Sequence, residues 1–228
     1  AVRFLERLQV PFYKIASHSI TDLPLIDFVA RLRKSVIMST GMCTIREVDE
    51  AVAILKRSRC SFALLHCVSA YPTIPEEANI KVIDLLRERY RCLVGFSGHE
   101  RGDFITVCAA ARGARIIERH ITLDREMAGF DHKISLDPVE THELVRKLRE
   151  VETIIGSGVK EIAEIEKITR AKYRRSIVAN KCIKRGSRIA KRMVSLKNPG
   201  TGLPPRELKN VIGKTRHLIS SADKIKEI

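Results

Sequence analysis

Several features that would place a protein in a membrane or outside the cell are missing from this 228-residue sequence. It has no run of about 18 uncharged apolar residues, so no membrane span is expected. It has no recognisable signal peptide, and none of its six cysteines forms a CxxC pair. We therefore expect a cytoplasmic protein with reduced, mostly buried thiols. The chain begins at Ala1 without an initiator Met, which suggests a fragment of a longer protein.

Aromatic residues are also scarce, at 5% of the chain, and they are scattered through its basic C-terminal part. Single-stranded nucleic acid is held by aromatic stacking platforms, so we do not expect nucleic acid as a partner. Positive charge, in contrast, is abundant. The formal net charge is +15, and residues 160–228 hold 19 Lys and Arg against 6 Asp and Glu. Such a patch attracts anions of any class, so a basic anion-binding module stays open as an alternative.

The first two thirds of the chain alternate short apolar runs with amphipathic segments. The runs are continuous and rich in Val, Ile, Leu and Phe, which is typical of strands buried on both faces of a parallel sheet. They are Phe12–Ala16, Val36–Ser39, Phe62–Cys67, Leu93–Phe96 and Arg115–Ile121. Helical periodicity marks Asp22–Leu32, Thr44–Arg57 with Thr44 as its cap, Asn79–Tyr90, Gly102–Arg112 and Pro138–Ile155.

Five βα units in this order predict an α/β fold with a parallel sheet and right-handed crossovers. A (β/α)8 barrel needs eight such units in about 250 residues. The sequence leaves two arrangements open. One is an open doubly wound sheet, and the other is a barrel whose first three units are missing.

The C-terminal part follows a different pattern. Residues 157–173 are polar and charged and predict a linker with a helical portion. Beyond them come two short strand-like runs, a turn-rich loop and a short helical segment, at Arg175–Ala179, Met193–Leu196, Asn198–Pro205 and Pro205–Ile212. We therefore predict an α/β domain over residues 1–156, a linker over 157–173 and a small domain over 174–228.

Polar side chains follow or end each predicted strand. In α/β barrels these ends form one rim that carries the reactive groups. Here they supply Lys14 and Ser17, then Ser39, then Ser69 and Tyr71, then Ser97 and His99, then Glu118 and His120. His99 and His120 end adjacent strands, so their imidazoles could share one divalent metal. Ser17, Ser39 and Ser97 could hold a phosphate with Lys14 as a point charge. Each histidine could equally be structural, and each serine an ordinary turn residue.

Four further histidines do not suggest catalysis. His66 and Cys67 are neighbours within one apolar strand and point to opposite faces, so a catalytic dyad is not expected. His18, His142 and His217 are predicted to lie on the surface.

A series of motifs occurs in a specific order. It comprises YKIAS at Tyr13–Ser17, MSTGM at Met38–Met42, HCVSAYP at His66–Pro72, GFSGHERG at Gly95–Gly102, ERHITLD at Glu118–Asp124 and DHKISLDP at Asp131–Pro138. Together these resemble the N-acetylneuraminate (sialic acid) synthase family, which includes legionaminic and pseudaminic acid synthases. NPGTG at 198–202 and NVIGK at 210–214 resemble the antifreeze-like (SAF) domain that ends these enzymes. The resemblance covers nearly the whole chain.

The resemblance implies a partial TIM (β/α)8 barrel followed by a small SAF domain of the β-clip type. It also implies a homodimer in which each SAF domain caps the partner's barrel. The implied enzyme condenses phosphoenolpyruvate with N-acetylmannosamine, or its 6-phosphate, to a nine-carbon 2-keto sugar acid and phosphate. It requires a divalent metal, Mn or Mg, which would polarise the sugar aldehyde and help position water.

By position in the motifs, the resemblance assigns a role to each candidate residue. His99 and His120 match metal ligands, and Tyr71 and Asp131 match sugar contacts. The residues that match phosphoenolpyruvate contacts are Lys14, Ser17, Ser39, Ser69 and Ser97.

The sequence departs from the family pattern in two places. The N-terminal barrel strands are absent, and with them an acidic residue, a Lys and amides that line the site. Bacterial members commonly carry an Arg directly before PGTG, where this chain has Asn198 beside Lys197. Three other functions remain as alternatives. They are a pseudaminic or legionaminic acid synthase, a non-catalytic fragment or basic module that binds nucleic acid or other anions, and an aldolase-like barrel that uses Lys14 as a Schiff-base amine.

Overall fold

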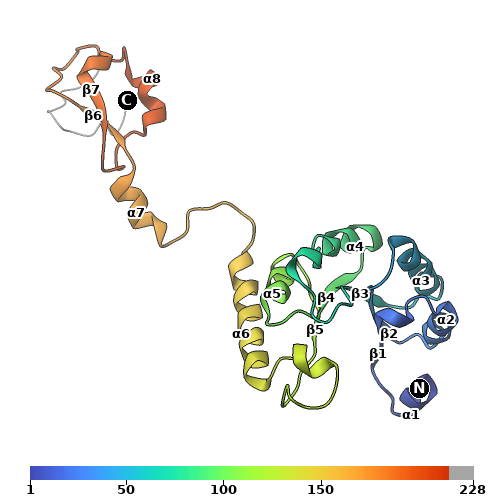
Figure 1. Ribbon diagram of the computed structural model, residues 1–228. Coiled ribbons are helices and arrows are strands. Elements are labelled where there is room, and N and C mark those ends of the chain that lie inside the picture. Colours follow the sequence, from blue (N-terminus) through green and yellow to red (C-terminus); the bar gives the residue numbers. More distant parts are fainter. Residues whose placement is uncertain (216–228) are drawn as a thin grey trace. The chain divides into compact units, whose positions relative to one another are not determined.

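The fold is seen in a computed structural model that describes residues 1–215 (Figure 1). The chain forms two compact units, one spanning Ala1–Gly158 and the other beginning at Val159. In the part of the chain that the structure describes, no helix is both long enough and apolar enough to cross a membrane.

The first unit is built on a parallel sheet with the strand order β1-β2-β3-β4-β5. Its strands are β1 (Phe12–Ile15), β2 (Ser35–Ser39), β3 (Phe62–Cys67), β4 (Leu93–Gly98) and β5 (Ile117–Arg119). A doubly wound sheet reverses its strand order at a switch point, whereas a (β/α)8 barrel adds each strand beside the one before. The sequential order therefore decides between the two predicted arrangements. The first unit is a partial barrel with five of the eight strands of a closed one.

Helices connect the strands and lie around the sheet (Figure 1). They are α1 (Val2–Arg7), α2 (Leu23–Arg31), α3 (Ile45–Arg57), α4 (Val82–Tyr90), α5 (Phe104–Ala111) and α6 (Pro138–Ile155). Three short 3-10 helices occupy Ser17–Ser19, Pro75–Glu77 and Asp131–Ile134. Each of the five predicted strands and five predicted helices of this unit is present, and α1 is an additional helix that the sequence pattern did not indicate.

The element boundaries differ from prediction where polar residues or unusual backbone angles intervene. Strand β4 runs two residues further than predicted, to Gly98, while β5 is shorter than predicted because only Ile117–Arg119 pairs with β4. Helix α4 begins at Val82 rather than Asn79, whose φ of 38° lies outside the helical range. Helix α5 begins after Gly102, whose φ is 72°.

Side-chain caps explain why two helices begin where predicted. At the start of α3, the Thr44 hydroxyl accepts the Glu47 backbone N–H, and the Glu47 carboxylate accepts the Thr44 N–H. The same reciprocal pair forms between Asp137 and Glu140 ahead of α6. Each capping box satisfies two backbone donors that a helix start leaves free.

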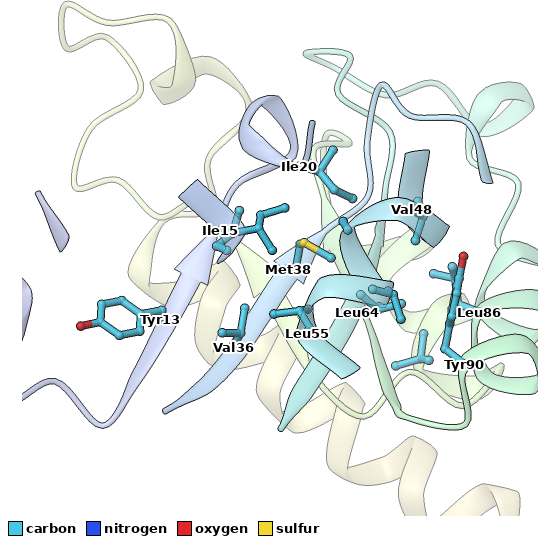
Figure 2. Close-up of a cluster of buried hydrophobic side chains, with 14 of the residues drawn as sticks. Tyr13, Ile15, Ile20, Val36, Met38, Val48, Leu55, Leu64, Leu86 and Tyr90 are labelled. Carbon is cyan, nitrogen blue, oxygen red and sulfur yellow. The ribbon is translucent and has the colours of Figure 1, made fainter. Parts of the chain in front are cut away.

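The hydrophobic core lies between the sheet and its helices (Figure 2). Tyr13, Val36, Met38 and Leu64 are buried in this core, with Leu55 of α3 packed among them. Side chains alternate along a strand, so the residues one position on face the opposite side of the sheet. In β1 and β2 those residues include Lys14 and Ser39. Because the apolar residues face the core beneath the helices, the polar residues between them face the side that would be the barrel interior.

The second unit is small and contains a two-stranded antiparallel sheet. Its elements are α7 (Glu166–Tyr173), β6 (Ser176–Ala179), β7 (Val194–Lys197), α8 (Leu208–Val211) and 3-10 turns at Lys191–Met193 and Pro205–Glu207. Both predicted strands are present, and the predicted helical segment consists of a 3-10 turn followed by α8. A separate core holds this unit together and includes Ile177, Ile189 and Val211. The predicted domain end at 228 and the prediction for His217 lie outside the described residues.

The cysteines only partly follow the prediction of mostly buried thiols. All six are free. Cys60 and Cys67 are buried, Cys43, Cys92 and Cys108 are half-buried, and Cys182 is exposed. The prediction is wrong for Cys182 because this residue lies in a loop of the small second unit rather than in an apolar strand.

Candidate functional site

A cavity of about 440 Å³ lies at the carboxyl ends of the five parallel strands. It is lined by Lys14, Ala16, Ser17, His18, Ser39, Met42, Cys67, Ser69, Tyr71, Ser97, His99, Glu118 and His120. Eight of the nine predicted site residues are in this set. The ninth, Asp131, lies beside it, with its carboxylate 3.8 Å from the ring of His120.

The register of the sheet explains why these side chains meet. Cys67 of β3 is paired with Ser97 of β4, and Ser97 is paired in turn with Glu118 of β5. Residues paired in register on adjacent strands lie side by side on one face. Lys14 and Ser39 belong to the same face of β1 and β2. Five strands thus deliver one polar row to the inner side of the partial barrel.

Lys14 is at the centre of a hydrogen-bond network along this row. Its ammonium donates to Ser39 Oγ at 2.8 Å and lies 3.3 Å from Glu118 Oε2. Ser97 Oγ in turn donates to Glu118 Oε1 at 2.7 Å. The Lys14 side chain is 28% exposed, so a small anion entering the cavity would meet its ammonium, paired with the Glu118 carboxylate, and two hydroxyl groups. Sequence reasoning placed Glu118 on the rim but gave it no role, and its link to Lys14 depends on register that the sequence alone does not show.

Gly41, which follows β2, lies against two serines of the cavity. Its backbone N–H donates to Ser17 Oγ at 2.9 Å. A Cβ at this position would lie 2.9 Å from Ser17 Oγ and closer still to Ser69 Oγ. No side chain fits there without displacing these hydroxyls. The loop after β2 therefore needs glycine at this position to let the two serines approach each other.

The two predicted metal ligands lie side by side. The rings of His99 and His120 are 5.3 Å apart between centroids. Nδ1 of His99 lies 3.1 Å from the carbonyl oxygen of Val68. Since a carbonyl can only accept, Nδ1 carries the proton and Nε2 keeps its lone pair for a ligand. An outer hydrogen bond of this kind is what orients metal-binding histidines in other proteins.

Tyr71 and Asp131 adjoin the histidine pair. The Tyr71 ring contacts His99 at 4.3 Å, His120 at 5.9 Å and Phe130 at 5.2 Å between centroids. Asp131 begins the short 3-10 helix that follows Phe130, and its Oδ2 lies 3.8 Å from Nδ1 of His120. An aromatic wall and a carboxylate therefore border the site on the side of β5.

Cys67 is the residue of this cavity that sequence reasoning missed. Its Sγ lies 3.8 Å from Nδ1 of His99 and 3.7 Å from Ser69 Oγ. Burial raises the pKa of the Cys67 thiol, but interactions with His99, Ser17 and Ser69 outweigh burial and lower the pKa overall. Burial likewise opposes protonation of His99, yet the interactions with Cys67 and Val68 raise its pKa overall. The sequence signal that could have identified Cys67 is its position as the last residue of the predicted strand Phe62–Cys67.

The environment of His120 differs from that of His99. Burial lowers the pKa of His120, and Asp131 opposes this shift only in part. A neutral imidazole is the form that binds a metal. Two imidazoles this close could supply two ligands to one divalent ion. Within residues 1–215, however, no three His, Cys, Asp or Glu side chains converge as a complete metal site.

The other histidines lie mostly as expected. His66 points away from the cavity, with Nε2 2.8 Å from the Ala78 carbonyl oxygen, so it forms no dyad with Cys67. His142 is exposed on α6. His18 is also exposed, as predicted, but it borders the cavity and so belongs to its entrance.

Known proteins resemble this chain over most of its length. Residues 1–160 match the NeuB family and residues 174–215 match the SAF domain. An uncharacterised protein of Methanocaldococcus jannaschii is 41% identical over 93% of this chain and 64% of its own length. The N,N'-diacetyllegionaminic acid synthase of Campylobacter jejuni is 36% identical over 94% of this chain and 65% of its own length.

A solved structure shows the same relation. The N-acetylneuraminic acid synthetase of Leptospira borgpetersenii, crystallised with citrate, is 36% identical and superimposes with a TM-score of 0.70. That match covers 74% of this chain and 59% of the synthetase chain. The present chain thus spans slightly less than two thirds of these relatives, and the partial barrel agrees with that difference. On the family match over residues 1–160, this chain belongs to the NeuB family and carries a SAF domain.

Proposed function

We propose that the protein to which this chain belongs condenses phosphoenolpyruvate with N-acetylmannosamine or its 6-phosphate. With one water consumed, the products would be a nine-carbon 2-keto sugar acid and inorganic phosphate. A divalent ion, Mn or Mg, would be bound in the cavity at the ends of β1 to β5.

One observation carries this proposal. A cation with hydroxyl groups (Lys14, Ser39 and Ser97) and a pair of metal-type imidazoles (His99 and His120) line a single cavity. Phosphoenolpyruvate is a small dianion or trianion that needs the first group, while a sugar aldehyde and a metal need the second. The relatives named above as acid synthases make the same chemistry the natural reading of this cavity.

Each group of residues has a separate role in this proposal. Lys14 and the serines would hold the phosphate and carboxylate of phosphoenolpyruvate, and Glu118 would hold the Lys14 ammonium in place. Tyr71 would pack on the sugar and Asp131 would accept a hydrogen bond from one of its hydroxyl groups. His99 and His120 would bind the metal through the nitrogens that face the cavity. When bound, that ion supplies Lewis-acid polarisation of the aldehyde oxygen.

The proposal extends to the assembly and to the division of the chain. Residues 1–156 would form the catalytic barrel segment, 157–173 the linker and 174–228 the SAF domain. Two chains would form a homodimer in which each SAF domain covers the partner's cavity. Analytical ultracentrifugation tests this arrangement, because a dimeric mass is expected and a monomeric mass at micromolar concentration contradicts it.

The reaction itself is tested by following phosphate release. The chain is mixed with phosphoenolpyruvate, N-acetylmannosamine and Mn²⁺, and the product is identified by mass spectrometry. Because relatives are longer, the same assay is run on a chimera whose N-terminal barrel strands come from the Methanocaldococcus relative. Release that depends on both sugar and metal, and is lost in His99→Ala, supports the proposal. Sugar-independent release, or no release from the folded chimera, contradicts it.

Two further experiments distinguish the alternatives. The chimera is offered N-acetylmannosamine, its 6-phosphate, and the amino-sugar precursors of legionaminic and pseudaminic acids. The sugar with the highest kcat/KM identifies the branch, and the proposal expects that sugar to be N-acetylmannosamine or its 6-phosphate. Borohydride trapping with a keto acid tests whether Lys14 forms a Schiff base. We expect none, because Lys14 Nζ is engaged by Ser39 Oγ and Glu118 Oε2.

A further inference from the structure

A buried ion pair lies directly behind the two predicted metal ligands. Arg119 precedes His120 in the chain, and Glu100 follows His99. Their charged groups are 3.0 Å apart, and their side chains are only 6% and 3% exposed. Neighbouring residues on a strand point to opposite faces, so the pair lies on the far side of the strand ends from the cavity.

The pair joins the two strand ends through several bonds. Arg119 Nη1 donates to Glu100 Oε1 at 3.0 Å, and Nη2 donates to the Glu100 backbone carbonyl at 2.9 Å. The second bond fixes the main chain one residue after His99. Thr106, in the first turn of α5, donates to the same carboxylate oxygen through its backbone N–H at 3.0 Å and its hydroxyl at 2.6 Å. The end of β5 is therefore tied to the end of β4 and to the start of a helix.

The backbone around each histidine is anchored from a second direction. The His99 carbonyl accepts the Thr73 N–H at 3.1 Å, and the His120 carbonyl accepts the Leu136 N–H at 3.0 Å. Arg119 adds a side-chain cross-link between the two histidine-bearing segments, beyond the backbone pairing of Gly98 with Arg119.

Stability does not explain this arrangement well. Burying two charges is costly, and an apolar pair of similar size is often as stable. Burial lowers the pKa of Arg119 even though Glu100 opposes the shift. Two atoms, Glu100 Oε2 and Arg119 Nε, are buried without a hydrogen-bond partner among the described residues. A pair with unused polar atoms is poorly optimised for folding, so its geometry needs another reason.

Gly98 shows how closely the carboxylate is fitted. A Cβ at Gly98 would lie 2.6 Å from Glu100 Oε2 and 2.8 Å from Thr106 Oγ1. Any side chain there would displace the carboxylate from Arg119. Glycine at position 98 therefore leaves open the space that the ion pair occupies, and a side chain there would fill that space.

We propose that Glu100 and Arg119 act as positioning residues that hold the His99 and His120 rings at the spacing one divalent ion requires. This inference rests on the proposed function, because it assumes that the two rings share a ligand. Arg119 suits the role better than lysine would, since its planar fork reaches a side-chain oxygen and a backbone oxygen at once.

The test uses Arg119→Lys, which keeps the charge but loses the fork, in the 228-residue chain. Mn²⁺ affinity is measured by electron paramagnetic resonance, which counts free Mn²⁺. We expect binding about tenfold weaker or more, as for other outer partners of metal ligands. The metal-free protein gives a second readout, the nuclear Overhauser effect between the two imidazole rings, which should weaken.

Two further variants keep the inference open to contradiction. Gly98→Ala should give the same two losses without removing either charge, and it serves if Arg119→Lys does not fold. The control is Arg112→Lys, which alters a half-exposed ion pair with Asp84 away from the cavity. Unchanged affinity and an unchanged inter-ring signal in a folded Arg119→Lys protein would overturn the inference. If wild type and His99→Ala bind Mn²⁺ equally, the proposed metal site fails, and the ring signal still decides whether the pair positions the histidines.

Discussion

The two units of this chain differ most in how their charges are compensated. Residues 1–159 carry 23 Lys and Arg against 21 Asp and Glu, whereas residues 160–228 carry 19 against 6. The first unit joins its charges in pairs such as Arg89–Asp49, Lys147–Asp103 and the buried Arg119–Glu100. In the described part of the second unit, the ion pairs are Lys167–Glu164 and Arg206–Glu207, and both are largely exposed.

The units also differ in where polar groups gather. In the first, one row of the sheet brings Lys14, Glu118 and the serines to a common cavity, and the histidines lie at its edge. In the second, a cavity of about 480 Å³ is lined by Arg170, Arg174, Arg175 and Arg206 with glycines and prolines of the 200–205 loop. The first arrangement combines donors, acceptors and imidazoles, as chemistry requires. The second offers only positive charge. On our proposal, the first unit carries the reacting groups and the second unit attracts anions.

The largest predicted effect concerns core substitutions, which test whether the two units unfold independently. Leu64→Ala removes a fully buried side chain from the core of the first unit and should lower its unfolding free energy by about 2–5 kcal/mol. Val211→Ala in the second core should cost about 1.5 kcal/mol, at roughly 0.8 per buried carbon. Hydrogen exchange resolved by mass spectrometry reads each unit separately. Each variant should accelerate exchange in its own unit, and acceleration of both units by either change would break the comparison.

The next prediction concerns the charge at the centre of the cavity. Lys14→Ala should weaken phosphoenolpyruvate binding about 10- to 100-fold, since hydrogen bonds to charged groups contribute about 1.5–3 kcal/mol. It would also leave the Glu118 carboxylate uncompensated beside the incoming anion. Isothermal titration calorimetry measures the affinity. Lys184→Ala, an exposed cation of the second unit, is the matched control and should leave affinity unchanged. Equal losses in both variants would mean that general charge, rather than the cavity, attracts the substrate.

The reverse experiment examines the cations of the second unit. Arg170, Arg174 and Arg175 are exposed and have no ion-pair partner among residues 1–215. Changing all three to Gln should reduce the salt dependence of heparin binding by a slope of about 2–3, at roughly 0.7–0.9 per cation. The control changes Arg87, Arg89 and Arg112 to Gln, which are paired with Asp84 or Asp49 in the first unit. An equally large reduction of the salt dependence in the control would show that ion pairing does not change how much an arginine contributes to heparin binding.

A smaller effect follows from the buried histidine of β3. Burial lowers the pKa of His66, and its hydrogen bond to Ala78 only partly opposes this. Above about pH 6.5 the ring is neutral in both folded and unfolded states, so it adds no pH dependence there. Below that pH the unfolded state takes up the proton first, and stability falls by up to about 1.4 kcal/mol per pH unit until the folded pKa is reached. Urea unfolding between pH 5 and 8 should show a shallower slope for His66→Gln. The same slope in both proteins would mean that His66 does not titrate on unfolding.

The sequence predicted the fold well where hydrophobic pattern alone decides it. Strand β3 and helix α6 have the bounds that the pattern indicates, because an apolar run and a capping box mark their limits. Strand β4 was predicted too short, since Ser97 and Gly98 interrupt the apolar run although the backbone continues to pair. The choice between a barrel and an open sheet needed the strand order, which depends on contacts far apart in the chain.

The candidate site was also predicted only in part from the sequence. Residues at strand ends were found because their place in the pattern is visible, and eight of the nine line one cavity. Cys67 and the role of Glu118 were missed, because both depend on the register between strands. The Arg119–Glu100 pair was not foreseen either. In the sequence, Arg119 and Glu100 look like two ordinary surface charges. They become buried only when β4, β5 and α5 pack together.

The central claim is that one cavity in the first unit binds both a metal and phosphoenolpyruvate. The most direct measurement is the enhancement that the protein adds to the ³¹P relaxation of phosphoenolpyruvate with Mn²⁺, above that of the protein-free mixture, because the added part requires the protein to hold the phosphorus and the metal close together. We predict strong enhancement with the wild-type chain, which is lost in His99→Ala and in Lys14→Ala and is retained in Lys184→Ala. Enhancement that is absent in wild type, or that survives loss of His99, would contradict the account.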